Sequence, residues 1–104
     1  MTAMTKHTAT ASSSGAIGKA DIVLSINGRD AGKYFLVIET QTGYSFLADG
    51  KGRKIGKPKK KKNKHLKLED KATGIIASKI INGEVVTNNE IKKALAMFRT
   101  ARAE

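Results

Sequence analysis

The chain has 104 residues, enough for one small domain with a modest core and tails. It contains no cysteine, which excludes disulfides, thiol nucleophiles and thiolate metal sites. No apolar run approaches the roughly 20 residues of a membrane span, so we expect no membrane partner. The formal net charge of +11 indicates an anionic partner such as nucleic acid.

The first 17 residues are rich in Thr, Ser and Ala and can bury little surface, so we expect a disordered tail over 1–17. Period-two and β-branched runs, separated by turn dipeptides such as Asn27-Gly28 and Asp49-Gly50, then predict strands over residues 21–26, 34–40, 44–48, 53–55 and 65–68. In the last strand, Leu66 and Leu68 should point inward. Some strands are apolar on both faces, which predicts a small closed antiparallel barrel over 18–69.

The last third of the sequence, 70–104, is predicted to be a helical extension packed on the barrel. A weak apolar stripe over 73–81 predicts a short helix that stops at Asn82-Gly83. Thr87 and Glu90 have the spacing of a capping box and predict a second helix over about 88–101. Its buried face should carry Ile91, Leu95 and Phe98.

One segment, KGRKIGKPKKKKNKHLK at 51–67, contains ten Lys or Arg and no acid. Such a linear array suits a polyphosphate backbone, because each neutralised phosphate releases a condensed counterion. The alternative is a solvated or disordered charge run. We expect the lysines to be loose until they meet a nucleic acid, so that replacing 59–62 with Ala would weaken binding and leave the melting temperature nearly unchanged.

Residues 21–39, DIVLSINGRDAGKYFLVIE, resemble a KOW motif, a strand, Gly-containing loop and strand found in ribosomal proteins and transcription elongation factors. The continuation YSFLADGKGRKIGKPKKKKNKHL and the later VTNNEIKKAL are similar to small bacterial RNA-binding proteins with one KOW domain, akin to KOW-carrying large-subunit ribosomal proteins. The resemblance implies a mainly β, SH3-like barrel of about five strands. It also implies RNA as ligand and no enzymatic activity, and we expect no cofactor.

The candidate RNA-binding residues come from the first turn of that motif and from the basic run. Gly32 is expected at a turn that needs a positive φ and lets the backbone pass close to RNA, while Asp30 should cap the turn. Arg53 offers a planar fork for phosphate. The full set is Arg29, Gly32, Lys33, Lys51, Arg53, Lys54, Lys57, Lys59, Lys60, Lys61, Lys62, Lys64, His65 and Lys67.

Other chemistry is poorly represented in the sequence. Phe35 and Phe46 are expected in the core, whereas Tyr34 and Tyr44 are either core residues or stacking partners for bases. Only two histidines are present, without the ligand cluster that a metal needs, and no catalytic or phosphate-loop motif is recognisable.

We therefore expect a non-enzymatic, cytoplasmic protein that binds ribosomal or other structured RNA and associates with the ribosome, with no small-molecule substrate. Two alternatives remain open. The barrel could be a protein-interaction module that docks on an acidic surface, such as that of a transcription complex. It could also compact DNA.

Overall fold

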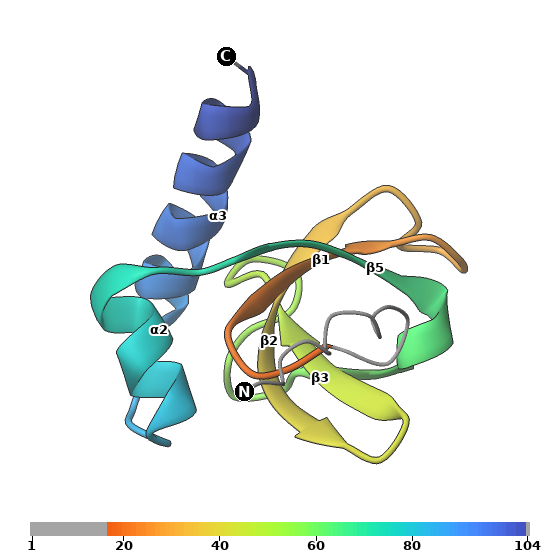
Figure 1. The fold of residues 1–104 in the computed structure, drawn as a ribbon, viewed down its shortest axis with the longest axis horizontal. Coiled ribbons are helices and arrows are strands. Elements are labelled where there is room, and N and C mark those ends of the chain that lie inside the picture. The colour runs from red at the N-terminus through yellow and green to blue at the C-terminus, as the bar shows by residue number, and fades with distance from the viewer. Residues whose placement is uncertain (1–16, 104) are drawn as a thin grey trace, which may run out of the picture.

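The computed structural model describes residues 17–103, which form five antiparallel strands followed by two helices (Figure 1). The strands run in the order β4-β3-β2-β1-β5 across one sheet. Their bounds are β1 Asp21–Ser25, β2 Tyr34–Gln41, β3 Tyr44–Ala48, β4 Lys59–Lys62 and β5 Leu66–Lys71, with a single 3-10 turn, η1 Asn63–His65, between the last two. The predicted tail falls on residues outside this part of the chain, apart from Ile17, which packs on the inner core.

The prediction of a mainly β, SH3-like antiparallel fold followed by a helical segment is confirmed. The prediction that the barrel closes is wrong: within residues 17–103, β4 and β5 are the two ends of the sheet and do not pair with each other. Short edge strands that carry lysines discourage pairing with other chains, and β4 consists of four lysines.

The fourth predicted strand is also placed wrongly. Arg53, Lys54 and Ile55 lie in the loop that follows β3, and the strand is formed by the lysine run Lys59–Lys62. Lysine has low strand propensity, but here pairing with β3 overrides it. The lysine run is therefore ordered by the protein itself and is not a loose segment.

Two hydrophobic clusters explain why the central strands are apolar on both faces. The cluster inside the curled sheet is formed by Val23, Phe35, Val37, Leu47 and Leu66. Leu68, on edge strand β5, is 38% exposed, so the prediction that both leucines of this strand enter the core is wrong for Leu68. The second cluster lies on the outer face, where the alternate residues along the same strands meet the helices.

That outer cluster joins the sheet to both helices, α2 Gly74–Ile81 and α3 Asn88–Ala103 (Figure 1). Its buried members are Ala20, Ile22, Leu36, Ala48, Ile80, Val86, Ile91, Leu95 and Phe98. The apolar second face of the strands thus faces the helices, whereas the sequence analysis attributed it to a sheet curled around its own core.

Both helix boundaries that the sequence predicts are present. After α2, Gly83 has φ +75° and donates to the carbonyl of Ile80, while Glu84 donates to that of Lys79, which is a Schellman stop. At the start of α3, the Glu90 amide donates to Thr87 Oγ1 at 3.1 Å and the Thr87 amide donates to Glu90 Oε1 at 2.9 Å. None of the helices in residues 17–103 is long and apolar enough to cross a membrane.

Candidate nucleic-acid interface

The loop between β1 and β2 presents the first group of candidate residues. Gly32 has φ +91°, and its amide donates to the Ser25 carbonyl at 2.8 Å. A Cβ built on Gly32 meets no atom within 4 Å, so the backbone conformation, rather than crowding, explains the glycine. Arg29 and Lys33, on either side of this turn, are exposed.

Asp30, between them, has a different role from the turn cap that the sequence predicts. Its carboxylate is buried, and Oδ1 accepts hydrogen bonds from Ser25 Oγ at the end of β1 at 2.7 Å and from Lys61 Nζ of β4 at 2.9 Å. Lys59 Nζ lies 3.4 Å from Oδ2, an oxygen that has no hydrogen bond within the described residues. Asp30 therefore ties the lysine strand to the β1–β2 loop.

The electrostatics of this contact favour the charged carboxylate. Burial acts to raise the pKa of Asp30, but the hydrogen bonds from Ser25 and Lys61 and the charges of Lys59 and Lys61 together outweigh it. The pKa of Asp30 is consequently held well below its usual range. One of these two lysine charges is thus offset inside the protein before any ligand arrives.

A second carboxylate shapes the loop between β3 and β4. Asp49 Oδ1 accepts hydrogen bonds from the amides of Lys51 at 2.9 Å and Arg53 at 2.8 Å. These bonds fix the backbone of the loop, and the basic side chains that it carries are exposed. The exposed basic residues of this loop are Lys51, Arg53, Lys54 and Lys57.

The same loop is fixed to the start of α3. The Ile55 amide donates to Asn88 Oδ1 at 2.7 Å, and Ile55 packs on the outer core. Gly50, with φ +78°, approaches α3 so closely that a Cβ would collide with the Asn88 carbonyl oxygen. The C-terminal helix therefore holds the basic loop in place.

A cleft of about 240 Å³ lies between the two loops. Phe35 contributes to its wall, and the two carboxylates that reach it are already engaged by the contacts described above. The charged residues around it are Arg29, Lys33, Arg53 and Lys59 as cations, with Asp30 and Asp49 as anions. Four cations against two occupied carboxylates leave the cleft electropositive, which suits a phosphate group.

The lysines of β4 are divided between the two faces of the sheet. Lys59 and Lys61 lie opposite Leu47 and Ser45, on the inner side, and turn toward Asp30. Lys61 has only 9% of its side chain exposed, and its Nζ also donates to the carbonyl of Asn27 at 2.8 Å. Reaching an RNA phosphate would require Lys61 to leave these partners.

The outward lysines have other surroundings. Lys60 and Lys62 lie opposite Phe46 and Tyr44, and both are exposed. Lys60 Nζ lies 4.6 Å from the centre of the Tyr44 ring and 6.0 Å from that of Phe46. Both rings are half-buried and outside the two hydrophobic clusters, so the prediction that Phe46 is a core residue is wrong, whereas Phe35 is buried as expected.

The remaining candidates lie beyond the end of β4 or on β5. Lys64 is exposed and His65 half-buried in η1, and exposed Lys67 has its Nζ 3.5 Å from Glu69 Oε2. Tyr34 packs on Phe98, with ring centres 5.1 Å apart, in the outer core. The predicted set is thus brought together only in part: the cleft gathers Arg29, Lys33, Arg53 and Lys59.

Sequence reasoning missed the acidic residues that organise this surface. Asp30 and Asp49 are the residues that place Lys59, Lys61 and the β3–β4 loop. The available signal was that each is an isolated acid next to basic residues, a pattern that also fits an ordinary turn cap.

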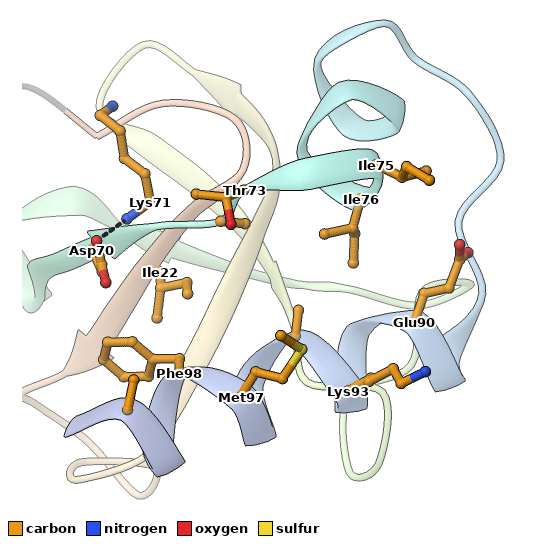
Figure 2. A pocket seen from close by; sticks show the side chains of 13 residues that line it. Ile22, Asp70, Lys71, Thr73, Ile75, Ile76, Glu90, Lys93, Met97 and Phe98 are labelled. Carbon is orange, nitrogen blue, oxygen red and sulfur yellow. Dashed lines mark hydrogen bonds between the residues drawn. The ribbon is translucent and has the colours of Figure 1, made fainter. Parts of the chain in front are cut away.

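A larger hollow of about 510 Å³ lies elsewhere, between α3 and the segment that joins β5 to α2 (Figure 2). Ile76 from α2 faces Met97 and Phe98 from α3, and the wall is mainly apolar. Its charged residues are two lysines and two carboxylates: Lys71, Lys93, Asp70 and Glu90. Because these charges balance, this hollow lacks the excess positive charge of the cleft between the loops.

Comparison of the chain with models of known protein families finds no match, and comparison with curated proteins finds none. The resemblance to KOW-domain proteins is therefore supported by the residues of the sequence alone. It stays a prediction.

Proposed function

We propose that this is a non-enzymatic RNA-binding protein that binds the phosphate backbone of structured RNA. It would associate with ribosomal RNA or the ribosome in the cytoplasm. The observation that carries the proposal is the cleft between the two basic loops. There, Arg29, Lys33, Arg53 and Lys59 come from three separate segments to surround one space. Charges that the fold brings together from distant segments point to an anionic ligand more strongly than a basic run alone.

The chemistry of the cleft favours phosphate over a generic anion surface. Arg29 and Arg53 carry planar guanidinium groups, which can each donate two hydrogen bonds to one phosphate. The exposed loop lysines add point charges that strengthen binding without reading sequence. Double-stranded RNA is recognised mainly through its shape and backbone, and this distribution of charge supports that mode.

Replacing two cations of the cleft with neutral side chains tests the proposal. For the double variant Arg29→Gln, Arg53→Gln we expect about tenfold weaker binding to a structured ribosomal RNA fragment, measured by filter binding. The dependence of log affinity on log salt should become shallower by roughly 1.5 to 2, as two phosphate contacts are lost. The matched control is Lys93→Gln, Arg99→Gln on α3, which removes the same charge outside the cleft.

Equal losses in both double variants would mean that only net charge matters, and would contradict a defined cleft. Two further measurements separate the alternatives. If the protein sediments with ribosomes after nuclease treatment, a protein surface is the partner. If duplex DNA competes as well as structured RNA at matched salt, a general polyanion binder is favoured.

A further inference from the structure

The outer face of the β3–β4 hairpin carries two aromatic rings that the core does not use. Tyr44 and Phe46 are two residues apart on β3, so they point to the same side of the sheet. Both are half-buried, and neither belongs to the inner or the outer hydrophobic cluster. The rings therefore form a small apolar surface that solvent reaches.

Positive charge borders these rings on one side. In the strand register, Lys62 lies opposite Tyr44 and Lys60 lies opposite Phe46. The ammonium of Lys60 is 4.6 Å from the centre of the Tyr44 ring, so the cation and the ring are in direct contact. Neither outward lysine forms an ion pair with any residue of 17–103.

The other side of the rings is polar and close to neutral. On β2, Gln41 lies opposite Tyr44, and Glu39 lies opposite Phe46. The Glu39 carboxylate is 3.4 Å from Lys19 Nζ, which offsets its repulsion of a phosphate. Glu39 also accepts from the Thr40 amide at 3.0 Å, and that contact, followed by Lys19, lowers its pKa and keeps it charged.

We propose that Tyr44 and Phe46, with Lys60 and Lys62, form a subsite for unpaired nucleotides of the bound RNA. In this subsite bases stack on the rings, and the two lysines contact the adjoining phosphates. The proposal rests on the RNA-binding function proposed above and adds a ligand class to it. The subsite faces outward, whereas the basic cleft opens between the loops.

The spacing of the rings favours an extended strand over a helix. Residues two apart on a strand are separated by about 6.6 to 6.8 Å. Bases in a duplex stay stacked on their neighbours, and the spacing along a strand, about 3.4 Å in B-form DNA, falls well short of that between the rings. A single strand can open to the longer spacing and place one base on each ring.

Lys60 lies over Tyr44 in the protein alone, and a stacked base would displace it. An exposed cation–ring contact is weaker than base stacking on the same ring. The released ammonium remains attached to β4, where it can meet the phosphate of the nucleotide that displaced it. Binding therefore exchanges one contact for two.

The first test compares two single strands with the same number of phosphates, a 12-nucleotide oligouridylate and an abasic oligomer. We expect wild-type protein to bind the strand with bases more tightly. Tyr44→Leu and Phe46→Leu should each weaken that binding by about fivefold to a hundredfold while leaving the abasic strand unaffected. If the variants bind both strands as wild type does, the subsite is refuted.

A second measurement covers the case in which a leucine variant does not fold. The chain has two tyrosines and no tryptophan, so Tyr34→Phe leaves Tyr44 as its only tyrosine and keeps an aromatic ring against Phe98. Its fluorescence, corrected for absorption by RNA, should be quenched by oligouridylate and not by the abasic strand. Equal quenching by both strands, or none, would overturn the proposal.

The outcomes separate the subsite from the broader function. If wild-type protein binds both strands equally and still binds structured RNA, the subsite fails and the RNA-binding proposal stands. If it binds none of these ligands in dilute buffer, both fail together.

Discussion

Two pairs of lysines within one strand have opposite surroundings. Lys59 and Lys61 turn inward to the carboxylate of Asp30, whereas Lys60 and Lys62 turn outward to solvent and the aromatic rings. The four are identical in sequence, and only the pleat of the strand distinguishes them. Lys61 serves the fold, Lys59 contacts Asp30 and also lines the basic cleft, and the outward pair is exposed.

This difference changes how a basic run should be interpreted. Counting charges treats every lysine as a potential phosphate contact, and it also predicts that replacing the whole run would leave stability nearly unchanged. The structure revises that second expectation, because removing Lys59 and Lys61 leaves the buried Asp30 carboxylate without its charged partners. A run of like charges can thus contain both structural and functional members.

The largest expected effect comes from removing the acid that holds the inward pair. Asp30→Asn should lower the free energy of unfolding by about 3 kcal/mol, because it leaves the poorly exposed Lys61 ammonium without its counter-charge. Urea unfolding followed by circular dichroism measures this. Glu39→Gln is the control, since its pair with Lys19 is exposed and should contribute little to stability. Similar losses in both variants would mean that Asp30 has no special structural role.

A smaller expected effect distinguishes two neighbouring lysines, Lys61 and Lys62. Lys61→Met should cost about 2 kcal/mol of stability, because Asp30 loses a charged hydrogen-bond donor. Lys62→Met should change stability by less than about 0.5 kcal/mol, yet make the salt dependence of RNA binding shallower by about 0.7 to 0.9. Denaturation and salt titration of the two variants give the comparison. If Lys61→Met weakens RNA binding more than Lys62→Met does while stability is unchanged, the assignment of the two faces is reversed.

Local features of the fold were predictable from the sequence. The alternation of Ile22 and Leu24 places a strand, and Thr87 with Glu90 places the start of α3, because each depends on neighbours within a few residues. The fourth strand was not predictable in this way. Lysines at 59–62 form a strand only because β3 pairs with them and Asp30 offsets their charge from about 30 residues away.

In the candidate site, too, features set by neighbouring residues were predictable and those set by distant residues were not. Sequence identified basic residues and the turn at Gly32, which local chemistry specifies. It could not show which cations share a cleft, because Arg29 and Arg53 meet only through the arrangement of two loops. It also assigned Phe46 to the core, since period two alone does not reveal that the helices stop short of this part of the outer face.

The smallest expected effect is a change in unfolding free energy with pH. It tests the contacts of Asp30 without altering a lysine. Because the pKa of Asp30 is lower in the folded protein than in the unfolded chain, its stabilising contribution is complete above about pH 4 and is lost as the pH falls further. From pH 7 to pH 3, where the unfolded carboxyl is mostly protonated, the loss should be about 1 kcal/mol. The difference in unfolding free energy between wild type and Asp30→Asn should shrink by that amount, measured by urea unfolding at both values. Subtracting the variant cancels the other carboxylates, so a difference that stays constant would mean that Asp30 is not held in its charged form by Ser25, Lys61 and Lys59.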